Sequence, residues 1–449
     1  MTHPILRAAT CAAAIALCLS SAQAQDKPDD KASALSILTD LTMETGPRPA
    51  GSPEEARARD WASARLKSLG FQNVKTDTFP ITGYVRGTDS AALTAPFPHK
   101  LAVTALGYSG TTPDGGISAE VVYFATLDAL KAAPAGSLKG KIAFVDHAMK
   151  PNQDGSGYGP YGNVRRQGPG IASQKGAAAI VIRSIGTDKH RNPHTGVIGW
   201  QKDVTPIPAG AVSNPDADMI ALIARTGKPM TLSLTLSGRT TAGMTSGNVI
   251  GELPGRDPSL PKIVIACHLD SWDLGMGVID DGAGCAIITA AALKAQQGGK
   301  LLRTVRVLWA GSEEIGGFGG DAYAKVYGGE AHALAMESDF GADRVWNFKQ
   351  TRLNPNVTEK VRAALNPMGI VASADKADGG ADVEAIIEAQ KLAVIDLSQD
   401  GTRYFDLHHT PDDTLDKVDP AQLQQNVDAW AQVLKVVANE PGPLAQPQP

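Results

Sequence analysis

Histidines and carboxylates, the side-chain types that bind metal ions, stand directly after apolar stretches of this chain. His268 and Asp270 follow a four-residue apolar stretch, so their side chains would share one face at the end of a strand. A carboxylate beside a metal-bound imidazole fixes the tautomer of the ring and raises its basicity. A His-x-Asp sequence after a strand is more often structural, so this pair alone leaves both interpretations open.

Pairs of adjacent acids occur at two further places. The sequence Val278-Ile-Asp-Asp-Gly-Ala-Gly puts Asp280 in front of small residues that open a helix, where it could cap the helix or bridge two cations. The apolar stretch 305–311 is followed by a serine and then by Glu313 and Glu314. Because alternate side chains at a strand end point to different places, one acid can bind metal while its neighbour activates water.

Two more candidate ligands lie further along the chain. Asp339 comes just after the apolar stretch 333–336, and His409 lies in the sequence Tyr404-Phe-Asp-Leu-His-His-Thr near the end of the chain. Each has a structural alternative when taken alone. Five separate segments that each carry a candidate metal ligand in such a position are not expected by chance. Together they predict a metal site of imidazole nitrogen and carboxylate oxygen, the ligand atoms that suit zinc.

Strands and helices alternate in the part of the chain that carries these residues. The expected strands are 263–266, 305–309, 333–336 and 392–396. The expected helices between and after them are 283–296, 356–365 and 420–437. This alternation predicts an α/β fold with a mainly parallel, mixed sheet and helices on both faces. Sites in such sheets form beyond the carboxyl ends of the strands, where the candidate ligands stand.

The texture of the sequence changes between about residues 115 and 242. Short apolar stretches of strand type alternate there with turns, and a Gly/Pro-rich stretch, 151–170, interrupts them. We expect an inserted β-rich domain at 115–242, with the remainder of the mature chain, 25–114 and 243–449, forming the catalytic domain. About 425 mature residues are too many for one ordinary core, which agrees with two domains.

The combined motifs resemble those of the M28 family of metallopeptidases, and within it the carboxypeptidase Q-like group. They occur in the order of that family: His268-x-Asp, Asp280-Asp-Gly-x-Gly, Glu313-Glu, Glu337-Ser-Asp and His409-Thr-x-x-Asp-Thr. The resemblance covers nearly the whole mature chain. The insertion is similar to a protease-associated domain, and its Pro193-His-Thr-Gly sequence also looks like that group.

The resemblance implies a fold of the zinc-exopeptidase type and two zinc ions per chain. It implies five ligands, which are His268, Asp280, Glu314, Asp339 and His409. Asp280 would bridge both ions, Glu314 and His409 would complete one site, and His268 and Asp339 would complete the other. Glu313 would be the general base and Asp270 the carboxylate that orients His268, while His408 would lie beside the ligands or face the substrate.

The function implied by the resemblance is hydrolysis of dipeptides or short peptides by an exopeptidase. An aminopeptidase that releases N-terminal residues is the alternative within the same class. A third hypothesis is a binding protein with this fold but without catalysis. The presence of every ligand and of the base argues against it, and metal analysis separates the two.

The first residues have the features of a secretory signal, which we expect to span 1–24. A basic residue and a short apolar stretch precede Ala22-Gln-Ala, the small-x-small form that signal peptidase cuts. The apolar stretch is too short to cross a bilayer, so we expect a secreted or periplasmic protein without a membrane anchor. The formal net charge of −5 does not favour a nucleic-acid partner, and a homodimer is left open.

Two cysteines, Cys267 and Cys285, lie outside the expected signal. One stands beside His268 and the other in the first turn of an expected helix. Small buried side chains are the favoured interpretation, and a disulfide in an oxidising compartment is left open.

Overall fold

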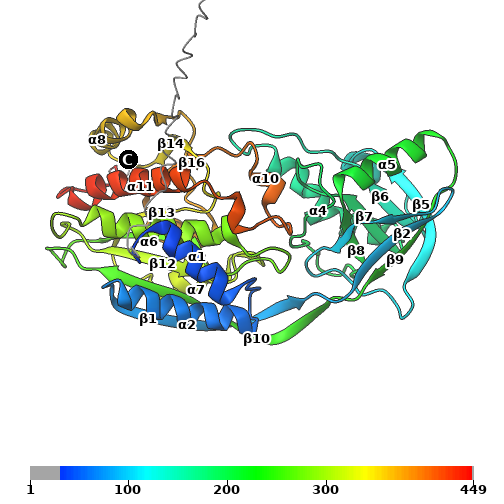
Figure 1. Cartoon of the computed structure of the whole chain (residues 1–449), viewed down its shortest axis with the longest axis horizontal. Helices are drawn as coiled ribbons and strands as arrows, with labels where there is room; N and C mark the ends of the chain where they lie inside the picture. Colours follow the sequence, from blue (N-terminus) through cyan, green and yellow to red (C-terminus); the bar gives the residue numbers. More distant parts are fainter. Residues whose placement is uncertain (1–30, 447–449) are drawn as a thin grey trace, which may run out of the picture. The chain divides into compact units, whose positions relative to one another are not determined.

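The computed structural model describes residues 31–446, and the expected signal at 1–24 lies outside this range. The described residues contain two eight-stranded sheets (Figure 1). The first has the order β1-β10-β12-β11-β13-β16-β14-β15 and the second the order β3-β2-β9-β5-β6-β7-β8-β4. No helix within the described residues is long and apolar enough to cross a membrane.

The first sheet is mixed. Its strands, in spatial order, are β1 Gln72–Val85, β10 Arg239–Leu253, β12 Val305–Ala310, β11 Lys262–His268, β13 His332–Glu337, β16 Ala393–Gln399, β14 Val345–Thr351 and β15 Val371–Ala372. The neighbours from β12 through β11 and β13 to β16 are parallel, whereas β1, β10 and β14 introduce antiparallel pairs. The mixed α/β fold expected from the sequence is therefore confirmed.

Helices pack on both faces of the first sheet. They are α1 Ala34–Thr45, α2 Pro53–Ser68, α6 Ala283–Ala295, α7 Phe318–Tyr327, α8 Pro355–Leu365, α9 Ala381–Gln390 and α11 Pro420–Asn439. The alternation along β11 divides the core: Ile263 and Ile265 pack in a cluster with α6 and α11, whereas Val264 and Ala266 pack with α7 and α9. The sequence did not predict α7, which begins in a glycine-rich stretch.

The second sheet is formed by the segment between β1 and β10. Its strands are β2 Asp89–Ala95, β3 His99–Leu101, β4 Val103–Ala105, β5 Ile117–Phe124, β6 Ile142–Val145, β7 Ala179–Arg183, β8 Ala209–Val212 and β9 Thr231–Leu236. Val85 at the end of β1 pairs with Arg239 at the start of β10, so segment 86–238 leaves and rejoins the first sheet at one point (Figure 1). It begins well before residue 115, where we expected the insertion to start. The short strands β2 to β4 suit either sheet, and only their long-range pairing decides between the two.

The inserted segment is also less purely β than the sequence indicated. It contains α3 Leu127–Ala132, α4 Tyr158–Gln174 and α5 Asn214–Arg225, and its strands β5 to β8 are parallel. Most of the Gly/Pro-rich stretch expected to interrupt the strands belongs to α4. Helix α4 contains two prolines. Pro160 lies in the first turn, where a missing N–H costs nothing, and Pro169 is buried inside the helix.

The two cysteines form a disulfide, which corrects the favoured interpretation from the sequence. Cys267 at the end of β11 is bonded to Cys285 in the first turn of α6, with a Cα–Cα distance of 5.1 Å. Both side chains are fully buried. Because Cys267 and His268 are neighbours in a strand, the cysteine faces α6 and the imidazole lies on the other side, as the alternation predicts.

Candidate metal centre

The seven site residues predicted from the sequence lie together at one edge of the first sheet. His268 ends β11, Glu313 and Glu314 follow β12, and Asp339 follows β13. These three strands are parallel, so their carboxyl ends meet at the same edge. Asp280 comes from the short π-helical turn η1, Val278–Gly282, and His409 lies just after the short helix α10, Tyr404–Leu407.

His268 contacts two of the predicted ligands. Its Nε2 lies 3.2 Å from Oδ1 of Asp280 and 3.3 Å from Oδ1 of Asp339. The opposite ring nitrogen, Nδ1, lies 2.9 Å from the carbonyl oxygen of Asp270. A hydrogen bond from Nδ1–H to this carbonyl leaves the lone pair of Nε2 facing the two carboxylates, which is the tautomer that a metal ligand needs.

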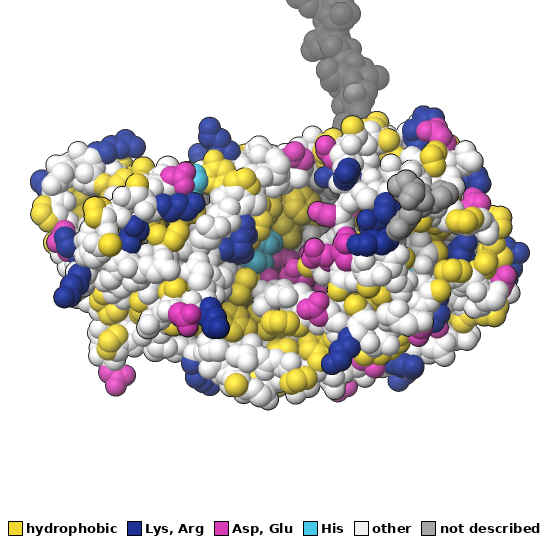
Figure 2. All heavy atoms as spheres, turned by 180° about the vertical axis from the view of Figure 1, so that it is seen from behind, with side chains coloured by type: hydrophobic (Ala, Val, Ile, Leu, Met, Phe, Trp, Pro, Cys, Tyr) yellow, Lys and Arg dark blue, Asp and Glu magenta, His cyan; other side chains and the backbone are white. Residues whose placement is uncertain are grey.

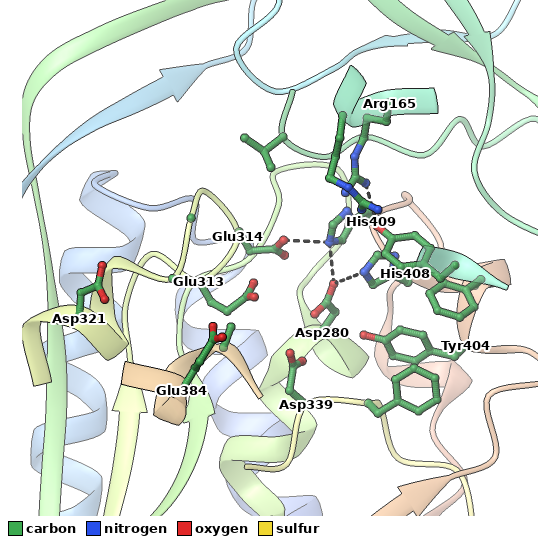
Figure 3. Close-up of a pocket in the computed structure, with 18 of the residues that line it drawn as sticks. Arg165, Asp280, Glu313, Glu314, Asp321, Asp339, Glu384, Tyr404, His408 and His409 are labelled. Atoms are coloured by element: carbon green, nitrogen blue, oxygen red, sulfur yellow. Dashed lines mark hydrogen bonds and ion pairs between the residues drawn. The ribbon is translucent and has the colours of Figure 1, made fainter. Parts of the chain in front are cut away.

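His409 faces the other side of Asp280. Its Nε2 lies 2.8 Å from Oε2 of Glu314 and 3.1 Å from Oδ2 of Asp280. The backbone of His409 is left-handed, with φ of 58°. Asp280 therefore has one oxygen toward His268 and the other toward His409, the arrangement of a carboxylate that bridges two cations. Figure 3 shows the contact of Asp280 with His409. His408 Nε2 lies 3.4 Å from the same Asp280 Oδ2.

Asp270 positions two parts of the site. Its carboxylate accepts hydrogen bonds from the backbone N–H groups of Glu313, at 3.1 Å, and Glu314, at 3.3 Å. The distance from Nδ1 of His268 to the Asp270 carboxylate is 3.7 Å, too long for a hydrogen bond. The orientation of His268 that we assigned to the carboxylate thus comes from the carbonyl of the same residue, because the carboxylate is occupied by the Glu313-Glu314 turn.

Buried polar groups hold the loops that carry the ligands. Asp413, part of the His409 motif, accepts from the N–H groups of Val278 and Ile279 through Oδ1, at 2.9 and 2.7 Å. Arg48 is fully buried and donates to the carbonyl oxygens of residues 269, 276 and 277. Together they fix both ends of the loop that leads from His268 to Asp280.

Asp281 is adjacent to Asp280 but has a different role. Its carboxylate accepts from the backbone N–H of His268 at 3.2 Å and from that of Gly284 at 2.8 Å. A Cβ at Gly284 would collide with the carbonyl oxygen of Ser338, which explains why glycine is needed here. Asp281 therefore ties the end of β11 to the start of α6.

Four of the five predicted ligands, all except the fully buried His268, line a pocket of about 720 Å³. Figure 2 shows a hollow in which histidine and acidic side chains gather. In Figure 3, Glu313, Glu314, Asp280 and Asp339 point toward one another, with His409 and His408 beside them. Helix α4 of the inserted segment forms part of the wall through Tyr158, Arg165 and Arg166. The pocket is thus built by helices and loops of the inserted segment and of the part of the chain that forms the first sheet.

Burial and mutual repulsion govern the charges of the site. Burial, followed by the charge of Asp280, raises the pKa of Glu314 to about 7. Burial also raises the pKa of Glu313 well above its usual value, with the charges of Asp339 and Glu314 adding to the effect. Burial opposes the charge of Asp280, but the imidazoles of His408, His268 and His409 outweigh it and hold its pKa well below the usual range. So many acids in one buried place call for cations.

The donor set fits zinc. It offers imidazole nitrogens and carboxylate oxygens, and ligand atoms of His268, Asp280 and Glu314 lie within 4.8 Å of one another. Among the predicted ligands, three buried carboxylate oxygens have no hydrogen-bond partner within the described residues; they are Asp280 Oδ2, Glu314 Oε1 and Asp339 Oδ1. Buried acceptors without donors are costly, and metal ions at this position would satisfy all three.

The sequence assigned no role to several residues that the structure places in or beside this pocket. Tyr158, Arg165 and Tyr404 line the pocket, and His194 stacks on His409. His194 stands in the Pro193-His-Thr-Gly sequence, whose resemblance to a family group was the only available signal. The other three carry no motif, and two of them lie in the Gly/Pro-rich stretch that was not expected to be helical.

The family resemblance and the fold agree with comparisons to known proteins. The model of "Peptidase family M28" matches residues 248–434. Carboxypeptidase Q of Bos taurus is 32% identical over 411 residues, which cover 90% of this chain and 84% of that protein. Carboxypeptidase Q of Rattus norvegicus is 33% identical over 416 residues, with the same 90% and 84% coverage. The chain belongs to peptidase family M28.

Solved structures give the same result. A peptidase M28 precursor from Shewanella amazonensis is 44% identical, with a TM-score of 0.89 and coverage of 93% of this chain and 95% of that one. A zinc aminopeptidase from Bacillus subtilis has a TM-score of 0.64 at 18% identity, covering 91% and 95% of the two chains, which shows a shared fold alone.

Proposed function

We propose that this protein is an exopeptidase that hydrolyses dipeptides or short peptides at a site with two zinc ions, as carboxypeptidase Q-like enzymes are expected to do. The observation that carries the proposal is the position of Asp280 between two sets of ligands. His268 and Asp339 lie on one side of it, and His409 and Glu314 on the other. One carboxylate between two such sets supports two metal ions rather than one.

The residues around these ligands have distinct tasks in the proposed reaction. Zinc ions bound there would polarise the scissile carbonyl and make a water molecule more acidic. Glu313, next to a ligand but not itself among them, accepts the proton of the attacking water and delivers it to the nitrogen of the departing amine. Its backbone N–H is fixed by Asp270 at 3.1 Å, so the base is held by the residue that also orients His268.

An aminopeptidase is the second candidate, and acidic side chains on the pocket wall favour it. Asp321 on α7 and Glu384 and Glu388 on α9 are exposed and line the same pocket as the metal ligands. Carboxylates in this position would attract the ammonium group at the start of a peptide. A zwitterionic dipeptide also carries an ammonium group that these carboxylates would attract, so the acids alone do not separate the two candidates.

Metal analysis and a peptide panel test the proposal. The purified mature protein should hold about two zinc ions per chain, lose peptidase activity on chelation and regain it with zinc. Dipeptides with free termini should be cleaved, and peptides blocked at the recognised terminus should not. A fully folded protein that binds no zinc and cleaves none of these peptides would overturn the proposal in favour of a binding role.

We also propose that the protein acts outside the cytoplasm after removal of residues 1–24. The disulfide between Cys267 and Cys285 supports this location, because disulfides persist in oxidising compartments and are rare in the cytosol. N-terminal sequencing of the exported protein should begin at Gln25.

A further inference from the structure

Arg165 is a buried arginine without an acidic partner. Only 4% of this residue is exposed, and it forms no ion pair with any carboxylate of residues 31–446. What remains exposed faces the pocket, because Arg165 is one of its lining residues. Burying a guanidinium group without a negative charge is costly, so its presence beside the candidate metal centre calls for an anion that the chain itself does not supply.

The inserted segment holds one nitrogen of this guanidinium group in place. Nη1 of Arg165 lies 2.8 Å from the hydroxyl of Tyr158, 2.6 Å from Nε2 of His194 and 3.1 Å from the carbonyl oxygen of Thr195. Gly196, with φ of 134°, completes the cradle, because a Cβ there would collide with the guanidinium group. The sequence His194-Thr-Gly therefore holds the guanidinium group of Arg165 in place.

These contacts all involve Nη1 and leave Nε and Nη2 of Arg165 without a partner among the described residues. Nε of Arg165 is buried and has no hydrogen-bond partner, and Nη1 is already used, which leaves Nη2 as the nitrogen that can face the pocket. Arg166 lines the same pocket and likewise forms no ion pair within residues 31–446. Burial and the neighbouring charge of Arg165 lower the pKa of Arg166, and an anion bound between the two would relieve their repulsion.

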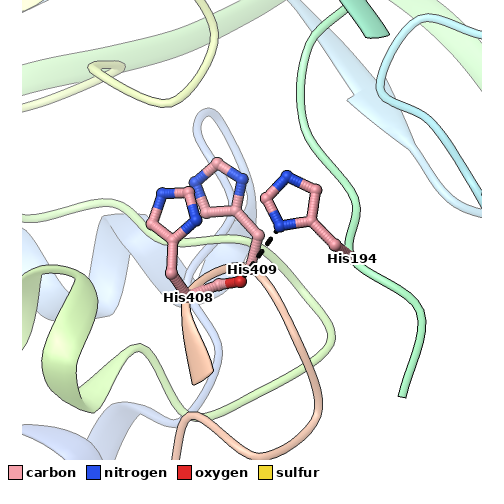
Figure 4. A group of neighbouring side chains, drawn as sticks. All are labelled: His194, His408 and His409. Carbon is pink, nitrogen blue, oxygen red and sulfur yellow. Dashed lines mark hydrogen bonds between the residues drawn. The ribbon is translucent and has the colours of Figure 1, made fainter. Parts of the chain in front are cut away.

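Arg165 is connected to the candidate metal centre through the imidazole of His194 and through the carbonyl oxygen of Thr195, which lies 3.3 Å from Nδ1 of His409. The ring of His194 lies 4.9 Å from that of the ligand His409, and its Nδ1 lies 3.1 Å from the carbonyl oxygen of His408 (Figure 4). With Nδ1–H as donor to that carbonyl, Nε2 accepts from Arg165, so one tautomer satisfies both contacts. In Figure 3, Arg165 lies near His409 and away from Asp321 and Glu384. The pocket therefore has basic side chains on the side of His409 and acidic side chains on the side of Glu313.

We propose that Arg165, with Arg166 beside it, binds the free α-carboxylate of the peptide substrate. The inference rests on the proposed function and deepens it, because it assigns the recognised terminus: the enzyme acts as a carboxypeptidase or dipeptidase. The terminal carboxylate is the one anion that every unblocked peptide carries, and a guanidinium group is the side chain best suited to bind it. Arg165 thereby makes the inserted segment a part of the substrate site.

The test compares dipeptides with uncharged side chains as free acids and as C-terminal amides. The zinc-loaded wild type should favour the free acids by about 10- to 100-fold in kcat/KM, the range expected for a hydrogen bond to a charged group. Arg165→Met should lower kcat/KM for the acids by about that factor and leave the amides nearly unchanged. Arg239→Met, which removes an exposed arginine of β10, is the matched control and should alter neither.

The ratio of acid to amide within each variant excludes general damage, since misfolding lowers both rates together. Equal rates for acids and amides in the wild type would overturn the inference while leaving the peptidase function intact. Equal losses for both substrates in Arg165→Met would overturn it as well. Failure to cleave any peptide would instead refute the proposed function.

A binding measurement needs no turnover and no variant. Leucine should raise the melting temperature of the zinc-loaded wild type, whereas leucinamide, which lacks the carboxylate, should raise it much less. Equal shifts with the two compounds, or none with either, would count against a carboxylate site at Arg165.

Discussion

The carboxylate of Asp270 accepts the backbone N–H of Glu313 at 3.1 Å, while the carbonyl oxygen of the same residue lies 2.9 Å from Nδ1 of His268. One fully buried residue thus orients both a predicted zinc ligand and the predicted general base. Because Asp270 fixes the tautomer of His268 and the position of Glu313, a substitution of Asp270 should affect metal binding and catalysis together.

Replacement of Asp270 by Asn tests this coupling. The amide keeps one oxygen but presents an NH₂ group to a backbone N–H, so the Glu313-Glu314 turn should shift. We expect zinc affinity to fall by about 10- to 100-fold, as is common for residues that support metal ligands, together with a lower kcat. Chelator competition and steady-state kinetics measure the two effects. Wild-type values for both would refute the positioning role.

Replacement of Glu313 by Gln should separate catalysis from metal binding. The variant should keep the zinc content of the wild type, because Glu313 is not a predicted ligand, and kcat should fall by about 10²- to 10⁴-fold through loss of the general base. Metal analysis and kinetics on the same preparation check both parts. Glu44→Gln, at an exposed position of α1, is the control. A rate close to that of the wild type would exclude Glu313 as the base.

Removal of the disulfide by Cys267→Ala together with Cys285→Ala should destabilise the protein. The bonded residues are 18 apart in the sequence, and closing a loop of that size contributes about 3 kcal/mol to the free energy of unfolding. Urea denaturation of the oxidised wild type and the double variant gives this difference. Thiol titration of the unreduced, denatured mature protein should find no free cysteine, and two free thiols would contradict the disulfide.

Glu252 should make stability depend on pH. Burial opposes its charge, but hydrogen bonds from Lys262, Asn73 and Arg306 outweigh it and lower its pKa from 4.5 to about 2. A group whose pKa is lower in the folded state stabilises the protein above its unfolded pKa, and this contribution is lost as the pH falls toward the folded value. The contribution of Glu252 is therefore complete at neutral pH and declines between about pH 4.5 and 2.

The measurement compares wild type with Glu252→Gln in the metal-free state, so that zinc release does not contribute. The difference in the free energy of unfolding between the two proteins should be larger at pH 7 than at pH 3. A difference that stays the same over this range would show that the ionised carboxylate is not what Glu252 contributes.

The short-range patterns of the sequence were enough for the four parallel strands at the centre of the first sheet, β12, β11, β13 and β16, and for candidate ligands at their ends. An apolar strand followed by an acid or a histidine specifies both the element and the place of the side chain, so His268, Glu314 and Asp339 could be brought to one edge in advance. The path of the inserted segment could not be predicted in this way. The strands β2 to β4 have no pattern that distinguishes one sheet from the other, and α4 depends on tertiary packing to hold a helix that contains Pro169.

The sequence by itself determined the candidate ligands and the chemistry expected of them, because metal ligands are recognised by residue type and by their positions at strand ends. Only the tertiary structure decided what surrounds that centre. The contact of Arg165 with His194 joins residues 29 apart in the sequence, and the stacking of His194 on His409 joins the inserted segment to the end of the chain. Such contacts depend on the packing of α4 and its neighbouring loop against the first sheet, which no local pattern encodes.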